Sequence, residues 1–181
     1  MTNPTIRLID FRRYRPDDHD AVWVVFADCT SQLGFDSGPW DDDMHHIPRV
    51  YLQSGGEFLV GEYAGRVVAF AGLQRDSEQR ATIRRVGVHP SAQRRGFGKA
   101  LMTELERRAR RMGIETLRLD TSLSQLAAQQ LYRACGYREQ GHVVLSGVEC
   151  ILFEKVLGSG GDVQSRDVSV NRIGFKNLIE Q

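Results

Sequence analysis

Residues 82–101 decide the fold, and they read TIRRVGVHPSAQRRGFGKAL. The first part of this stretch, 82–88, contains Thr, Ile and Val around two arginines and predicts a strand in the interior of a sheet. The last part opens a helix that ends at Gly113, because apolar residues recur there at helical spacing. This apolar stripe consists of Phe97, Leu101, Leu105, Ala109 and Met112. A strand, a glycine-containing loop and a long amphipathic helix therefore follow one another.

The loop between this strand and this helix suits an anion. The first N–H groups of a helix have no acceptor inside the helix, and the helix dipole adds partial positive charge there. Gly96 and Gly98 remove side chains where a phosphate would approach, and Arg94, Arg95 and Lys99 place cations beside it. A pyrophosphate is the natural guest. Neither the P-loop pattern GxxxxGK(S/T) nor the dinucleotide pattern GxGxxG is present.

Strands and helices continue outward in both directions. Patterns of apolar residues predict strands at 6–11, 57–63, 66–73, 116–121, 143–145 and 149–156. Helices are predicted at 17–33, at 41–52 with an interruption at Pro48, and at 125–135. The first helix would bury Val22, Val25, Phe26, Cys29 and Leu33. Because 158–161 reads Gly-Ser-Gly-Gly, we expect one domain over 1–157 and a flexible linker with a polar tail over 158–181.

The composition is that of a soluble globular protein. The 181 residues are 41% hydrophobic and 26% charged. The longest apolar run, 21–27, is far shorter than the ~18 residues of a membrane helix, and the N-terminus shows no signal peptide. Three separated cysteines indicate reduced thiols, so we expect a cytoplasmic protein that does not bind a membrane. We expect no metal, because the adjacent His45 and His46 cannot share one helix face.

Charge is segregated along the chain. Residues 84–111 carry nine basic and two acidic side chains, whereas residues 17–62 carry ten acidic side chains and one basic. We expect the first segment to attract an anion and the second a cation, although solvated helix faces would give the same counts. The basic stretch lacks interleaved aromatic residues and the sequence pI is about 7.8, so we expect no nucleic-acid partner.

Two segments carry a family resemblance. Residues 86–90 (VGVHP) and 93–101 (QRRGFGKAL) resemble the acetyl-CoA-binding motif of the GNAT superfamily of acetyl-CoA-dependent N-acetyltransferases. Residues 131–137 (LYRACGY) are similar to its second signature, at the end of a later helix. The resemblance implies an α/β (α+β) fold. Its sheet would be mixed and mostly antiparallel, with a splayed parallel central pair, strands 82–88 and 116–121, and it would be flanked by helices.

The resemblance also implies where acetyl-CoA, the co-substrate, would bind. Pantetheine would fill the gap between the splayed strands and bond to their backbone. Gly87 suits such a close approach, although a packing requirement would explain it equally. Gln125 stands where many members have an asparagine that contacts pantetheine. The residues expected to bind the cofactor are Val86, Val88, Gln93, Arg94, Arg95, Gly96, Phe97, Gly98, Lys99 and Gln125.

The same resemblance assigns catalysis to Tyr132, as the general acid that protonates the departing CoA thiolate. A tyrosine packed in the core is the alternative. Many members carry a glutamate on the fourth strand as general base, and here that position is Thr82, whose neutral hydroxyl is a poor base. The groups that could replace the glutamate are Asp120, His45, His46 and Glu57. Otherwise the proton leaves through ordered water.

The acceptor is expected to be a small-molecule amine, which must lose a proton before it attacks because its free pKa is near ~10.4. We place its pocket between the first two helices and the far end of the sheet, at Trp40, Asp41, Asp42, His45 and His46. Carboxylates beside an aromatic ring suit a cationic amine, whereas acidic residues at a helix start are the alternative.

Two rival functions stay open at this point. One is a CoA-binding or regulatory module of the same fold that does not catalyse, as the missing glutamate would suggest. The other is a protein or peptide acetyltransferase. The resemblance also leaves room for a homodimer.

Overall fold

The computed structural model describes residues 8–34 and 41–158. Three parts of the expectation lie outside the described residues: the start of the strand at 6–11, the acceptor candidate Trp40 and most of the tail. The limits of the domain stay predictions. The described strands are β1 (Asp10–Arg13), β2 (Glu57–Tyr63), β3 (Arg66–Arg75), β4 (Arg80–Val88), β5 (Thr116–Ser122), β6 (Arg138–Leu145) and β7 (Val148–Val156). The helices are α1 (His19–Gln32), α2 (Asp42–His45), α3 (Phe97–Arg111) and α4 (Leu126–Ala134).

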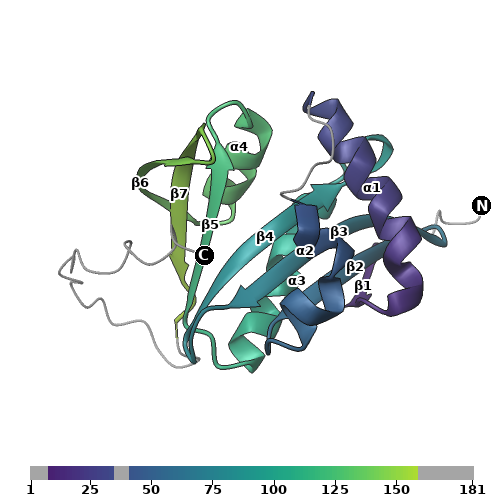
Figure 1. The fold of residues 1–181 in the computed structure, drawn as a ribbon, viewed down its shortest axis with the longest axis horizontal. Helices are drawn as coiled ribbons and strands as arrows, with labels where there is room; N and C mark the ends of the chain where they lie inside the picture. Colours follow the sequence, from purple (N-terminus) through teal and green to yellow (C-terminus); the bar gives the residue numbers. More distant parts are fainter. Residues whose placement is uncertain (1–7, 35–40, 159–181) are drawn as a thin grey trace, which may run out of the picture.

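The strands form one seven-stranded sheet in the order β1-β2-β3-β4-β5-β7-β6. All neighbouring strands in the described chain run antiparallel except β4 and β5, which are parallel. This arrangement confirms the mixed, mostly antiparallel sheet with a parallel central pair (Figure 1). None of the helices within residues 8–34 and 41–158 is long and apolar enough to span a membrane.

The central parallel pair opens into a V. Cα pairing between β4 and β5 covers Arg80 with Thr116, Ala81 with Leu117 and Thr82 with Arg118. Beyond that point the two strands diverge, and β5 leaves with β7 and β6 (Figure 1). An irregularity in β4 accompanies the divergence, because the register against β3 shifts and Arg85 has a φ of 58°. An extra residue of this kind bends a strand and increases its twist.

Two hydrophobic cores cover the two faces of the sheet. The helices α3 and α4 pack on one face, while α1 and α2 lie on the other (Figure 1). The α3 side buries the expected stripe of Leu101, Leu105 and Ala109. The α1 side buries Val22, Val25 and Phe26 of α1, as expected, with the rings of β2 and β3. Alternate side chains of β4 and β5, Ala81, Ile83, Leu117 and Leu119, face the α3-side core.

Gly87 has a packing role, one of the two explanations that the sequence left open. A Cβ built on Gly87 would lie 2.5 Å from Cζ of Phe70, the residue paired with it on β3. The missing side chain therefore makes room for an aromatic ring in the α1-side core. Packing explains this glycine, and a close approach of the cofactor is not needed for it.

Several element boundaries also differ from the expectation. Leu33 is 47% exposed because α1 ends at Gln32, one residue earlier. The helix expected over 41–52 divides into α2 and a π-helical turn, Pro48–Leu52, because proline begins a new turn. β6 starts five residues before the expected strand, in a polar segment that is almost entirely exposed. β1 pairs with β2 over Asp10–Arg13 rather than 6–11.

Candidate active site

The loop before α3 presents a run of backbone N–H groups without protein acceptors. In the described chain, none of the N–H groups of residues 94–99 donates to a backbone carbonyl outside a regular element, and Gly96, the N-cap, receives no side-chain cap. Arg94 and Gly96 have φ values of 59° and 80°, which turn successive amides toward a common side. The helix dipole adds positive character at this end. The geometry fits an anionic group such as a pyrophosphate.

The side chains of this loop divide into two groups. Arg94 and Lys99 are exposed and have no ion pair with any described residue. Arg95 lies over the ring of Tyr63, 5.6 Å from its centroid. Phe97 is buried against the β2–β3 hairpin, so only its backbone could meet a cofactor. The candidate cations beside the amides are therefore Arg94 and Lys99.

Gln93 has a structural contact of its own. Its amide nitrogen donates to the carbonyl of Val88 at 3.0 Å and to Gln32 of α1 at 2.9 Å. Its side chain therefore fastens the loop to β4 and α1. The thiol of Cys29 donates to the same carbonyl at 3.3 Å, and burial raises the pKa of this thiol to about 11.

The edge of β4 facing the V lacks a strand partner. The N–H of His89 bonds to Val68 of β3, so the backbone of Val88 points the other way, toward the V. Val86 stands two residues earlier, beside the irregular part of β4. No residue of β5 pairs with either of them in the described chain. An extended ligand could add to this edge, as the resemblance implies for pantetheine.

Tyr132 lies in α4 with its ring packed near Tyr137 and Phe153. Burial, followed by the charge of Asp120, raises its pKa well above the ordinary tyrosine value. Its hydroxyl makes no hydrogen bond to a described residue. Unlike the hydroxyl of Tyr137, it is not both completely buried and without a partner. Tyr132 is buried in the core, and a phenol that stays protonated at neutral pH fits a proton donor. At the start of the same helix, Gln125 accepts from Thr121 at 2.6 Å, which leaves its amide N–H groups available.

Asp120 and Arg84 occupy the point where the V opens. Thr82 and Arg118 form the last pair of the parallel ladder, and Arg84 and Asp120 lie two residues further along the same face. Loss of hydration raises the pKa of Asp120, although the charges of Arg84 and Arg85 oppose the shift. A carboxylate with a raised pKa is a better proton acceptor than an ordinary one.

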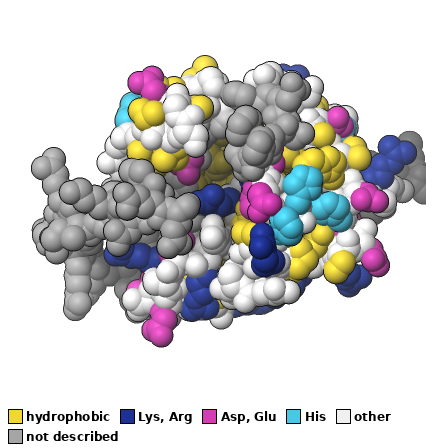
Figure 2. Space-filling model, viewed as in Figure 1, with side chains coloured by type: hydrophobic (Ala, Val, Ile, Leu, Met, Phe, Trp, Pro, Cys, Tyr) yellow, Lys and Arg dark blue, Asp and Glu magenta, His cyan; other side chains and the backbone are white. Residues whose placement is uncertain are grey.

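The other general-base candidates are engaged elsewhere. Glu57 is buried and pairs with Arg108 at 3.1 Å. His45 packs on Trp23 with ring centroids 4.4 Å apart, and His46 pairs with Asp42 at 3.1 Å. Figure 2 shows a group of histidine side chains beside acidic and basic ones on one face of the molecule. Of the four candidates, Asp120 is the one beside the V.

The acidic tract before α2 is already paired. Arg85 donates to Asp41 at 2.8 Å and to Asp43 at 2.6 and 2.9 Å. Tyr51 also donates to Asp43. Asp42 is exposed and pairs with His46 and Arg49. Two of the carboxylates expected to attract a cation therefore hold α2 against β4 through one guanidinium.

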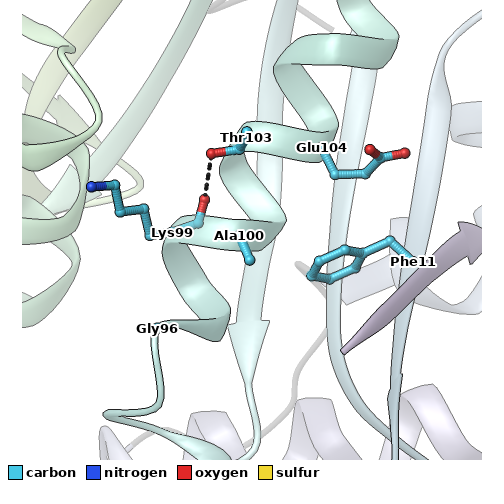
Figure 3. Close-up of a pocket in the computed structure, with 6 residues that line it drawn as sticks. All are labelled: Phe11, Gly96, Lys99, Ala100, Thr103 and Glu104. Atoms are coloured by element: carbon cyan, nitrogen blue, oxygen red, sulfur yellow. Dashed lines mark hydrogen bonds between the residues drawn. The ribbon is translucent and has the colours of Figure 1, made fainter. Parts of the chain in front are cut away.

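A separate hollow lies on the outer side of α3. It has a volume of about 490 Å³ and is lined by Phe11, Gly96, Lys99, Ala100, Thr103 and Glu104. Figure 3 shows the ring of Phe11 and the carboxylate of Glu104 on one side, while Lys99 points away from them. This hollow is wide open and flanks the loop rather than the opening of the V. In the described residues, no three His, Cys, Asp or Glu side chains cluster as metal ligands would.

Sequence reasoning missed the contacts between α1 and the cofactor loop. His89 pairs with Asp28 at 2.9 Å, in addition to the Cys29 and Gln32 contacts. These partners are about 60 residues apart in sequence, and no local pattern announces them. It also missed Arg84, since two adjacent arginines in a strand would ordinarily point to opposite faces.

Comparison with known proteins agrees with this geometry. The family model for the acetyltransferase (GNAT) family matches residues 12–137. The chain is 29% identical over 143 residues to an acetyltransferase of Sodalis glossinidius, which covers 79% of this chain and 96% of that protein. It is 30% identical over 90 residues to an uncharacterized N-acetyltransferase of Bacillus subtilis, which covers 50% of this chain and 53% of that protein.

Solved structures share the fold. A GNAT-family acetyltransferase from Staphylococcus aureus superposes with a TM-score of 0.75 at 19% identity, over 83% of this chain and all of that one (100%). A Salmonella typhimurium protein solved with its cofactor acetyl-CoA gives a TM-score of 0.67 at 19% identity, over 90% and 99% of the two chains.

Proposed function

The chain belongs to the acetyltransferase (GNAT) family, and from that premise we propose that it moves the acetyl group of acetyl-CoA directly to the amine of a small-molecule acceptor. The observation that carries the proposal is the presence of two backbone surfaces that no described strand pairs with. One is the run of N–H groups over 94–99, and the other is the β4 edge at Val86 and Val88. The first suits the pyrophosphate of the cofactor and the second suits its extended arm.

Two side chains beside the V can handle the protons of the reaction. Bound acetyl-CoA supplies a thioester, whose carbon–sulfur bond breaks as the carbon–nitrogen bond to the amine forms. Asp120 accepts the proton that the ammonium must lose, directly or through a water. Tyr132 donates its proton to the departing sulfur and regains one from solvent. The high pKa of Tyr132 keeps it protonated at neutral pH, as this role requires.

The variant Tyr132→Phe tests the assignment. Only the hydroxyl is lost and the ring packing stays, so turnover should fall by roughly a hundredfold or more while acetyl-CoA affinity is retained. Release of CoA thiol with a broad panel of amines gives the turnover, and calorimetry gives the affinity. Unchanged turnover in this variant would remove Tyr132 from the chemistry.

The same panel separates the proposal from its rival. A non-catalytic CoA-binding module would bind acetyl-CoA and release no thiol with any amine. A chain that turned over peptide substrates and no small amine would instead be a protein or peptide acetyltransferase.

A further inference from the structure

We propose that Arg84 recognises an anionic group on the acceptor, so that the acceptor is a zwitterion like a free amino acid, with its amine toward Asp120. This inference rests on the proposed function and names the substrate class for that site. It departs from the cationic acceptor that the acidic tract suggested. Three features of the opening of the V support it.

The first feature is register. The parallel pairing of β4 with β5 ends at Thr82 and Arg118, and continuing it by two residues brings Arg84 opposite Asp120 on the same face of the sheet. Arg84 pairs with Gly72 of β3. A Cβ built on Gly72 would meet the ring of Tyr51 in the α1-side core, so this face of the pair is the α1 face. Both charges therefore lie on the α1 face, at the point where the sheet stops being continuous.

The second feature is the contrast between two adjacent arginines. The irregular β4 backbone, with Arg85 at a φ of 58°, directs both arginines to the α1 face. Arg85 is committed to Asp41 and Asp43. Arg84 is exposed and has no hydrogen bond or ion pair with any residue in 8–34 or 41–158. One guanidinium holds the fold together, and its neighbour is left for another partner.

The third feature is that Arg84 and Asp120 do not close on each other. They are near enough for Arg84 to act on the titration of Asp120, yet the described chain contains no ion pair between them. Arg118, the other charge on this face of β5, pairs with Glu154 of the neighbouring β7 at 2.7 Å, so these two charges cancel. Two opposite charges held apart are complementary to a molecule that carries both charges, with its anionic group at Arg84 and its amine at Asp120.

A polycation would meet a poorer environment. Asp41 and Asp43 are both already paired with Arg85, and Arg84 would repel a second positive charge placed beside the reacting amine. A guanidinium binds carboxylate and phosphate oxygens through two parallel hydrogen bonds, so an acceptor with such a group gains where a plain amine does not.

The test compares matched acceptors. Free amino acids are assayed beside their amides and their decarboxylated amines, with spermidine as the polycation and thiol release as the readout. For amino acids that are turned over, kcat/KM should exceed that of the amide and of the decarboxylated amine by roughly tenfold or more. The variant Arg84→Gln should reduce the amino acid to the level of its amide through KM, so that the ratio of kcat/KM between the two acceptors falls to about one.

Two further variants sharpen the result. Arg80→Gln is the matched control, because Arg80 is an exposed arginine on the same strand, at the closed end of the V, and it should change nothing. Arg84→Lys keeps the charge without the paired donors and should restore part of the preference. Melting curves check that each variant is folded.

The outcomes separate this inference from the proposed function. Spermidine or decarboxylated amines turned over better than every amino acid, or equal losses for all acceptors in Arg84→Gln, would overturn the role of Arg84 and leave acetyl transfer intact. The same holds if no free amino acid is turned over while other amines are. Failure of acetyl-CoA to bind, or absence of thiol release with every acceptor, would overturn the proposed function and this inference with it.

Discussion

The two sides of the V are built in different ways. The cofactor side consists of backbone groups from one continuous segment, 86–99. In the described chain, the N–H groups of residues 94–99 donate to no backbone carbonyl outside a regular element, and no residue of β5 pairs with Val86 or Val88. The acceptor side consists of side chains from separate elements, Arg84 on β4, Asp120 on β5 and Tyr132 on α4. Substitutions on the first side should therefore act through backbone shape, and those on the second through charge and protons.

The largest effect is expected for Asp120→Asn. Loss of the proton acceptor should lower kcat/KM by roughly a hundredfold, and it should remove an acid limb of the pH–rate profile that lies above the ordinary aspartate range of about 4. The limb runs upward with pH, because the carboxylate is the active form. An Asn variant with the wild-type profile would exclude Asp120 as the base.

Asp120→Asn should also be more stable than the wild type at neutral pH. A carboxyl group with a raised pKa in the folded state binds its proton more tightly there, so stability is highest below the unfolded pKa and falls as pH rises through the folded one. Melting temperatures near pH 7 and near about pH 3 should show the gain at the higher pH only.

A smaller effect is expected for Gly96→Val, which tests the cofactor side. Gly96 has a φ of 80°, where a β-branched residue is strained, so the amide run should be distorted and acetyl-CoA affinity should fall by roughly tenfold or more. Gly113→Val is the matched control, because Gly113 has a φ of 78° at the other end of α3 and likewise has nothing within 4 Å of a built Cβ. It should lose stability and keep its affinity. Equal loss of affinity in both variants would show that strain alone is responsible.

The smallest effect is expected for Gln32→Ala. This change removes the side-chain bond to Gln93 that ties α1 to the cofactor loop, so the KM for acetyl-CoA should rise a few-fold with little change in kcat. Ser31→Ala, on the same exposed turn of α1, serves as the control. A change in kcat without a change in KM would contradict a role in holding the loop.

Sequence reasoning reached the cofactor side because its signals are local. The stripe after Phe97, the positions of Gly96 and Gly98 and the family resemblance predicted a strand, a loop and a helix, and the structure has all three. The splayed parallel pair, implied by the resemblance, is also present. These features depend on residues that are close together in the chain.

The acceptor side could not be predicted in the same way. Nothing near the Asp41–Asp43 tract shows that Arg85, more than 40 residues later, pairs with two of its carboxylates. Gly87 was explained by Phe70, a partner on another strand. The polar start of β6 looked like a loop because its side chains are exposed on a strand at the rim of the sheet. In the first two cases the deciding contact lies on another element of the chain.

The divergence of β4 and β5 has a consequence for solubility. Unpaired strand edges invite other chains to add to them, and most proteins must guard such edges at the rim of a sheet. Here the open edge at Val86 and Val88 lies in the middle of the sheet, flanked by β3 on one side and by the departing β5 on the other. A narrow ligand can reach it, whereas a strand of a neighbouring molecule would have to enter between two halves of the same sheet. The fold thus keeps a reactive backbone surface available without exposing it to aggregation.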